Sequence, residues 1–218
     1  MRAIRICLQA TLVTLILTGV LYPLAMTGMA QVLFPKAADG TLVVDSKGVV
    51  RGSALIGQAF VNPAYFQGRP SAAGNGYDAT ASSGSNLGPT SAKLHDRVKA
   101  DVERLHKENP DAPGLIPAEL VTASASGLDP HLSPAAADWQ IPRVARARNV
   151  APERLRALVA DKVEGRTLGI LGEPTVNVLL LNQALDTQFG APAPVPAAPA
   201  SAAPAQPAAP APPAAPAP

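Results

Sequence analysis

Cysteine is almost absent from this sequence and net charge is very low, and both shortages exclude functions. Cys7 is the only cysteine in 218 residues, and it lies in an apolar segment near the N-terminus. A single thiol cannot form a disulfide within the chain or a cysteine-based metal site. The formal net charge is only +2, whereas a nucleic-acid-binding domain usually carries a clustered basic face. We therefore expect no nucleic-acid partner.

Complete motifs for phosphate, metal or acyl chemistry are also missing. Residues 52–57 have the glycine spacing of a phosphate-binding loop, but Gln58 and Ala59 follow where that loop needs Lys and then Ser or Thr. The sequence contains no Asp-Lys-Thr-Gly-Thr phosphorylation motif, no Thr-Val-Gly-Tyr-Gly potassium filter and no Gly-x-Ser-x-Gly elbow. No two of the three histidines are three or four residues apart, a spacing typical of metal sites on helices. We therefore expect no catalytic residue, no metal and no tightly bound cofactor.

The longest apolar run lies near the N-terminus, where no charged residue occurs between Arg5 and Lys36. About twenty residues, 6–25, would cross a hydrocarbon core of ~30 Å as a helix with a rise of 1.5 Å per residue. Pro23 is expected to kink this helix near the outer interface. We predict that residues 1–36 comprise a cytoplasmic N-terminus and a single transmembrane helix, whose membrane-embedded positions include Ile6, Leu12, Leu17 and Leu21.

A cleaved signal peptide is the alternative interpretation of this segment. Arg2 and Arg5 would form its positive region, and residues 28–30 would form a small-residue cleavage site. The apolar run is longer than the ~7–15 residues usual in a signal peptide, which favours a retained anchor. Because Arg2 and Arg5 crowd the first turn, the positive-inside rule places the N-terminus in the cytoplasm and the following domain outside.

Residues 37–190 have the composition of one globular domain. Two β-branched runs in 41–51 flank a turn and predict a β-hairpin, and residues 62–89 are a long Gly-, Ser-, Asn- and Pro-rich segment without regular structure. Ser91 can cap a helix with an apolar stripe that ends near Asn109. A further helix is predicted to begin at Pro134, and Pro142 either breaks that helix or starts another. Two more helices are predicted, from Pro152 to Gly165 and from Thr175 to Asp186.

Strands near the start of the domain and helices after them indicate a mixed α+β or α/β fold. The segment 191–218 is different, since all but three of its residues are Ala or Pro and none is charged. Such a chain favours extended polyproline II conformation without a core. We predict a disordered tail or spacer.

A basic cluster follows the only tryptophan. Arg143, Arg146 and Arg148 come shortly after Trp139, and Arg69 stands among glycines and prolines. A solvated helix face is one interpretation of the cluster, and loop carbonyls can bind Arg69. The functional interpretation is that Trp139, Arg143, Arg146 and Arg69 form a docking surface for an acidic partner patch or an anionic ligand.

Several blocks in the right order closely resemble the C-subunit family of Kdp-type potassium-transporting ATPases. The resemblance covers the chain from the apolar segment to about Asp186, and the Ala/Pro tail lies outside it. The blocks that carry it are residues 51–58, 65–71, 83–88, 121–131, 139–149, 172–178 and 181–186.

This resemblance implies an accessory, non-catalytic subunit of a high-affinity potassium uptake pump in the bacterial inner membrane. Its expected partners are a potassium-binding channel-like subunit, a P-type ATPase subunit, a small fourth subunit and the lipid bilayer. The family is described as a catalytic chaperone that raises the ATP affinity of the ATPase subunit. In that description residues 121–127 are similar to an ABC-type signature motif, which makes Ser124, Ser126 and Gly127 nucleotide-related.

The charge distribution conflicts with direct contact to ATP, because ATP is cytoplasmic and the domain is expected outside. Any effect of this chain on ATP affinity would then be allosteric, and ATP would bind through the complex. Two alternatives stay open from the residues alone. One is a stand-alone membrane-anchored binding module in the cell envelope, and the other is a secreted hydrolase whose mature chain begins near Gln31.

Overall fold

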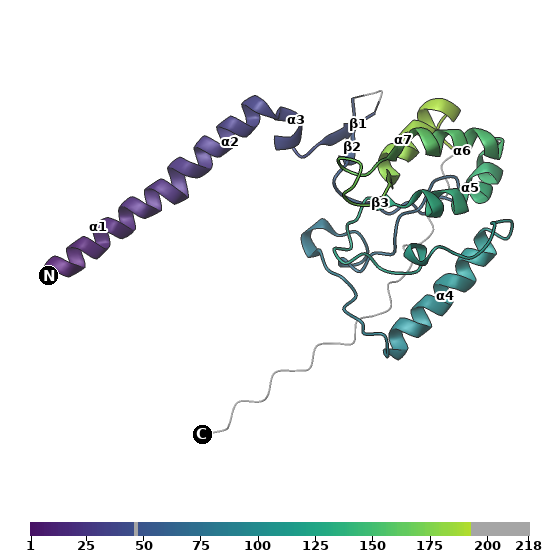
Figure 1. Ribbon diagram of the computed structural model, residues 1–218, viewed down its shortest axis with the longest axis horizontal. Coiled ribbons are helices and arrows are strands. Elements are labelled where there is room, and N and C mark those ends of the chain that lie inside the picture. The colour runs from purple at the N-terminus through teal and green to yellow at the C-terminus, as the bar shows by residue number, and fades with distance from the viewer. Residues whose placement is uncertain (46–47, 193–218) are drawn as a thin grey trace, which may run out of the picture.

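A computed structural model describes residues 1–45 and 48–192, and it shows a long helix that projects from a separate domain (Figure 1). The helix consists of α1 (Arg2–Ile16), a π-helical turn η1 (Leu17–Leu21) and α2 (Tyr22–Leu33), which run on without a break. Pro23 lies in the first turn of α2, directly after η1. Proline cannot donate to the carbonyl one turn back, and π-turns often mark the point where a helix bends.

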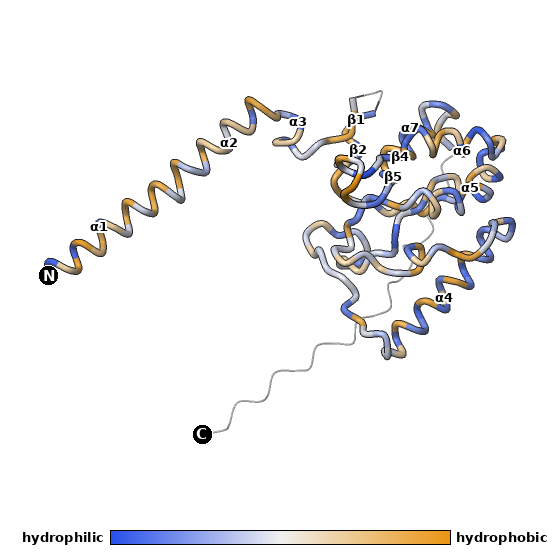
Figure 2. Tube along the Cα trace, viewed as in Figure 1, coloured by the Kyte–Doolittle hydropathy of each residue, from blue (hydrophilic) through white to orange (hydrophobic). Residues whose placement is uncertain are grey.

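None of the residues in this helix is buried. Leu12, Leu17 and Leu21 are between 52% and 57% exposed, and hydrophobic residues recur along the whole length of the helix (Figure 2). At 1.5 Å per residue its 32 residues measure roughly 48 Å, which exceeds a hydrocarbon core of ~30 Å. The predicted N-terminal helix is confirmed, and it continues beyond residue 25 to Leu33.

A short turn and a β-hairpin connect the long helix to the domain. Helix α3 (Pro35–Ala38) is followed by β1 (Leu42–Val44) and β2 (Val50–Ser53), which pair antiparallel. Asp45 accepts a hydrogen bond from the Val49 backbone N–H at 2.9 Å and pairs with Arg51 at 2.7 Å. The predicted hairpin is therefore confirmed, and Val43 is the only buried residue in its two strands.

The domain combines four longer helices with a small three-stranded antiparallel sheet in the order β3-β5-β4, which confirms the mixed fold class. Helix α4, capped by Ser91, confirms the predicted amphipathic helix. The elements in chain order are η2 (Ala79–Ala81), α4 (Ala92–Glu108), η3 (Ala118–Leu120), β3 (His131–Leu132), α5 (Pro134–Arg148), α6 (Pro152–Asp161), β4 (Val163–Glu164), β5 (Thr175–Asn177) and α7 (Val178–Phe189).

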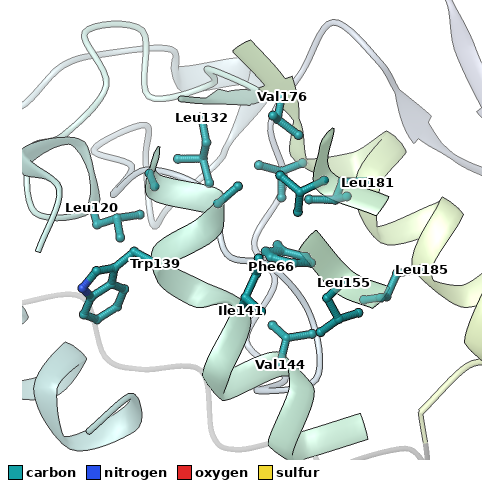
Figure 3. Packing of buried hydrophobic residues seen from close by; sticks show 14 of the residues in the cluster. Phe66, Leu120, Leu132, Trp139, Ile141, Val144, Leu155, Val176, Leu181 and Leu185 are labelled. Carbon is teal, nitrogen blue, oxygen red and sulfur yellow. The ribbon is translucent and has the colours of Figure 1, made fainter. Parts of the chain in front are cut away.

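The hydrophobic core is built mainly from α5, α6 and α7, and α4, η3, β3, β5 and the irregular segment also contribute buried residues. Phe66 is fully buried and lies between Ile141 of α5, Leu155 of α6 and Leu181 of α7 (Figure 3). Burying a phenylalanine side chain contributes about 1.5–3 kcal/mol. The segment 62–69 is thus part of the core although it forms no helix or strand.

Two predicted element boundaries are wrong. Pro142 neither ends a helix nor begins one, because α5 runs through it. Proline inside a helix loses one hydrogen bond and its ring clashes with the carbonyl one turn back, which together cost about 3 kcal/mol. Burial of Ile141 and Val144 on either side offsets that cost. The segment predicted as a helix from Thr175 begins as strand β5, and Asn177 ends the strand and caps α7 by accepting a hydrogen bond from Leu180 N–H at 3.2 Å.

The helix predicted to end at Gly165 is also shorter than expected. Helix α6 stops at Asp161, and residues 163–164 pair with β5 as strand β4. A strand of only two residues forms only where another strand pairs with it, here β5. The Ala/Pro tail beyond Pro192 lies outside the described residues.

Two buried side-chain amides hold the irregular segment 62–69. Asn182 accepts a hydrogen bond from the Phe66 N–H and donates one to the Phe66 carbonyl, both at 2.9 Å. Gln140 likewise accepts a hydrogen bond from the Gln67 N–H at 2.8 Å and donates one to the Gln67 carbonyl at 3.0 Å. Each amide thus supplies the donor and the acceptor that a neighbouring strand would supply.

Replacing Asn182 by alanine is expected to lower the free energy of unfolding by about 2 kcal/mol, because it leaves a buried N–H and a buried carbonyl unpaired. Thermal unfolding of the full chain in detergent measures this change. Gln188→Ala on the same helix is the matched control, because Gln188 is exposed. Substitutions at the surface usually change the free energy of unfolding by less than about 0.5 kcal/mol. Equal melting temperatures for the two variants would contradict the role of Asn182 in holding the segment 62–69.

Candidate functional site

The serine-rich loop 122–130 lies between η3 and β3, and its hydroxyl groups are engaged within the loop. Ser124 is 3% exposed, and its Oγ accepts a hydrogen bond from the Gly127 N–H at 3.1 Å. Ser126 Oγ accepts one from the Leu128 N–H at 3.1 Å and lies 3.2 Å from Ser124 Oγ. Hydroxyls that bind nearby backbone groups in this way stabilise turns.

Neighbouring segments pack tightly against this loop at Gly127. Gly127 has a φ of +69°, and a Cβ at this position would lie 2.7 Å from both Ala73 N and Ser83 O. The Ser83 N–H donates to Ser126 O at 3.0 Å, and the Ser71 hydroxyl donates to Gly127 O at 2.6 Å. Two parts of the irregular segment 62–89 therefore pack against the serine-rich loop at one glycine.

An ion pair between Arg69 and Asp129 lies at the edge of the loop. Arg69 Nη1 is 3.1 Å from Asp129 Oδ2, and their side chains are 26% and 29% exposed. The Tyr77 hydroxyl donates to the Arg69 carbonyl at 2.5 Å. Burial, together with the nearby Asp129 carboxylate, raises the pKa of Tyr77 to about 12. The pair borders an open hollow of about 540 Å³, whose lining includes Leu55, Ile56, Ser126 and Pro130.

Stability is expected to fall between about pH 10 and pH 12 because of Tyr77. The unfolded tyrosine ionises near its ordinary pKa of 10.0, whereas the folded one keeps its proton to about 12. The folded state binds more protons in this window, so the free energy of unfolding decreases as pH rises, by about 2 kcal/mol. Thermal unfolding at pH 9, 10 and 11 measures the slope. Tyr77→Phe is the control and should show a smaller slope, while an unchanged slope would contradict the assignment.

The loop does not present the geometry of a nucleophilic centre within the described residues. His131 Nδ1 lies 3.7 Å from Asp129 Oδ1, but the hydrogen bonds found in this part of the chain do not join a serine hydroxyl to His131. A triad needs a nucleophile and a base within hydrogen-bond reach. Over the same described ranges, no group of three His, Cys, Asp or Glu side chains could hold a metal ion.

The residues predicted to form a docking surface do not lie together on the surface. Trp139 and Arg143 are each 3% exposed. Arg143 donates to the carbonyls of Pro63 and Tyr65 at 2.6 Å and 3.1 Å, and to Gln140 Oε1 at 2.8 Å. Burial lowers its pKa to about 10. Arg143 is therefore placed to hold the segment 62–69, and it offers almost no surface to a partner.

Arg146 and Arg69 are the two predicted docking residues that keep accessible surface. The Arg146 side chain is 52% exposed and pairs with Asp111 at 2.7 Å. Arg148 belongs to the same predicted basic cluster, but its side chain is only 3% exposed and pairs with Asp186 at 2.7 Å. The same guanidinium lies 4.8 Å from the centroid of the Tyr65 ring. Arg146 and Arg148 are two residues apart, so on a helix their side chains point to different sides. This spacing was the signal in the sequence that the two arginines face different environments.

Comparison with known proteins decides the family. Residues 4–187 match the family model described as "KdpC: K+-transporting ATPase, c chain". The chain belongs to the KdpC family. A potassium-transporting ATPase KdpC subunit from Myxococcus xanthus is 64% identical over 191 residues, covering 88% of this chain and 89% of that protein. The KdpC subunit from Methylobacterium nodulans is 57% identical, covering 80% of this chain and 92% of that protein.

The KdpC assignment confirms the resemblance seen in the sequence blocks. A third relative, the KdpC subunit of Koribacter versatilis, is 54% identical over 84% of this chain and 94% of its own length. KdpC is an accessory subunit of a K⁺-transporting ATPase, and the long apolar helix near the N-terminus indicates a membrane-anchored protein. The family match ends at residue 187, so the Ala/Pro tail is an addition to the KdpC pattern.

Proposed function

We propose that this chain is a non-catalytic assembly subunit of a high-affinity potassium pump in the bacterial inner membrane. Its partners would be a potassium-binding channel-like subunit, a P-type ATPase subunit and a small fourth subunit. The observation that carries the proposal is the helix Arg2–Leu33, which has no charged residue after Arg5 and no buried residue. A helix that is hydrophobic all round must be covered by lipid or by other helices.

The length of that helix supports contact with partner proteins as well as lipid. It exceeds a hydrocarbon core of ~30 Å by several turns, so part of its apolar surface would lie outside the hydrocarbon core. Met29, Val32 and Leu33 at its C-terminal end are between 52% and 80% exposed. Burial of these side chains against a neighbouring subunit would stabilise the assembly by roughly 25 cal/mol per Å² of apolar surface.

In this proposal the N-terminus is cytoplasmic, the domain is extracytoplasmic, and any effect on ATP affinity is indirect. The family description of a catalytic chaperone would then be realised through the membrane helix and the partner subunits, with a coupling free energy of about 1–3 kcal/mol. The internal hydrogen bonds of Ser124 and Ser126 support this reading, because both hydroxyl oxygens already accept hydrogen bonds from backbone N–H groups of the loop.

Affinity purification from bacterial membranes tests the assembly role. The tagged full chain should retain the channel-like and ATPase subunits in mild detergent, and its deletion should abolish growth at limiting potassium. Recovery of the chain alone, with normal growth of the deletion strain, would instead favour the stand-alone envelope module. Serine substitution separates the ATP models. Ser126→Ala should leave the ATP KM of the complex within about twofold, whereas direct contact predicts a change of tenfold or more.

Orientation has its own expected result. In a Cys7→Ser background, a cysteine replacing the exposed Ala81 should react with a membrane-impermeant thiol reagent on intact cells stripped of their outer membrane. A cysteine replacing Ala3, on the other side of the anchor, should react only after lysis. The reverse pattern would place the domain in the cytoplasm and would make direct ATP contact possible.

A further inference from the structure

A groove separates the β1–β2 hairpin from α7, on a different part of the domain from the serine-rich loop. Its volume is about 660 Å³, which lies within the range of ~300–1,000 Å³ usual for ligand sites. The hairpin contributes Val43 and Asp45 to it, and α7 contributes Leu179, Gln183 and Thr187. The remaining lining residues are Arg51, Gln58, Phe60, Tyr65, Asn182, Asp186 and Ala191.

Aromatic rings and side-chain amides make up much of the lining. Phe60 and Tyr65 pack with ring centroids 5.7 Å apart and planes inclined by 54°. Gln183 Nε2 donates to the Val44 carbonyl at 2.9 Å, and Gln58 Nε2 donates to the Arg51 carbonyl at 3.0 Å. A carboxamide nitrogen carries two N–H donors, so each glutamine keeps a second N–H beyond the one that ties down the hairpin.

The chain leaves α7 directly beside this groove. Gly190 caps the helix, and its carbonyl accepts a hydrogen bond from Arg148 Nη1 at 2.7 Å. The same guanidinium lies over the ring of Tyr65, which lines the groove. The next residue, Ala191, is itself part of the lining. Arg148 thus fixes the point from which residues 192–218 continue.

We propose that this groove binds the Ala/Pro segment 193–218 of its own chain. Ala/Pro chains favour polyproline II, whose carbonyls have no internal donors and whose backbone conformation costs little entropy to fix. Grooves lined by aromatic side chains recognise such segments, and the free N–H groups of Gln58 and Gln183 are suitable donors for the carbonyls. The segment carries no charge, so its entry leaves the Asp45–Arg51 and Asp186–Arg148 ion pairs intact.

Because the Ala/Pro segment is covalently attached to the domain, even a weak affinity for the groove is sufficient to fill it. A segment joined through a short linker reaches an effective concentration of ~1 mM, so an intrinsic dissociation constant of about 100 µM would fill roughly nine-tenths of the grooves. The proposal is independent of the pump assignment, because it concerns a segment outside the KdpC match and a contact within one chain.

Photocross-linking of the full chain tests the proposal. A small diazirine amino acid at Thr187, which lines the groove, should cross-link to residues 193–218 and give a monomeric product identified by mass spectrometry. The matched control carries the same group at Gln188, the next residue on α7, which lines a different hollow. We expect at least a fivefold lower yield of tail cross-links from Gln188.

A second variant keeps the domain unchanged and alters only the tail. Replacing 193–218 with a Gly/Ser segment of equal length should reduce the Thr187 cross-link at least fivefold, because a Gly/Ser chain is a flexible coil without a preference for polyproline II. Equal yields at Thr187 and Gln188, or an undiminished yield with the Gly/Ser tail, would overturn the proposal. A cross-linked dimer as the main product would also overturn it, since the occupant would then be the tail of a second copy.

Discussion

Gly127→Ala is expected to lower the free energy of unfolding by about 4 kcal/mol. The backbone at Gly127 has a φ of +69°, and the added Cβ would lie 2.7 Å from the backbone N of Ala73 and the O of Ser83. The left-handed conformation costs about 1–2 kcal/mol with a Cβ, and overpacking adds about 1–3 kcal/mol. The melting temperature of the full chain in detergent should fall by roughly 10 °C for a domain of this size.

Two glycine controls separate the causes of this effect. Gly172 has a φ of +80° and no atom within 4 Å of the added Cβ, so Gly172→Ala carries only the conformational cost. Gly88 has neither constraint, and Gly88→Ala should be close to neutral. A Gly127→Ala melting temperature equal to that of Gly172→Ala would show that the neighbouring segments adapt. Because Gly127 acts through packing, loss of pump activity in this variant should accompany loss of folded protein.

Arg143→Met is expected to lower the free energy of unfolding by about 3 kcal/mol. Methionine keeps much of the apolar stem, but it leaves the carbonyls of Pro63 and Tyr65 and the Oε1 of Gln140 without their charged donor. Hydrogen bonds to charged groups contribute about 1.5–3 kcal/mol each, and removal of a buried charge returns part of that sum. Thermal unfolding and limited proteolysis at the segment 62–69 measure the loss.

Arg146→Met is the matched control three residues later on the same helix. Arg146 is half exposed and pairs with Asp111, and exposed ion pairs contribute about 0–1 kcal/mol. Arg143→Lys should resemble Arg143→Met, since a single ammonium group cannot replace the fork of the guanidinium. Reduced capture of partner subunits by Arg146→Met with normal stability would support a docking role for that residue. A stable Arg143→Met variant would refute the anchor role of Arg143.

Local sequence signals were sufficient where an element depends on its own residues. Helix α4 has its cap at Ser91, a stripe of apolar residues and an end at Asn109, and it is found as predicted. The β1–β2 hairpin follows equally from two β-branched runs and a turn. Local sequence signals did not predict strands β4 and β5, because two or three residues become a strand only when another strand pairs with them.

The serine and arginine side chains also differ in how far local sequence could predict their environment. Sequence spacing alone cannot reveal that Arg143 is buried and Arg146 is half exposed, since both follow Trp139 in one basic cluster. The distinction depends on the carbonyls of a segment about 80 positions earlier in the chain, as Arg143 donates to Pro63 and Tyr65. Likewise, residues 70–83 hold the backbone of the serine-rich loop, since the Ser124 N–H donates to the Pro70 carbonyl and the Ser83 N–H donates to the Ser126 carbonyl.

The amino-acid sequence by itself determined the apolar anchor, the mixed domain and the KdpC resemblance, because hydrophobic length, helix caps and contiguous blocks are local properties of a chain. Only the tertiary structure decided which polar side chains serve the fold. Gln140, Asn182 and Arg143 satisfy the backbone of an irregular segment that carries Phe66 into the core. Buried backbone groups must find partners wherever packing places them, and that placement is a property of the whole domain.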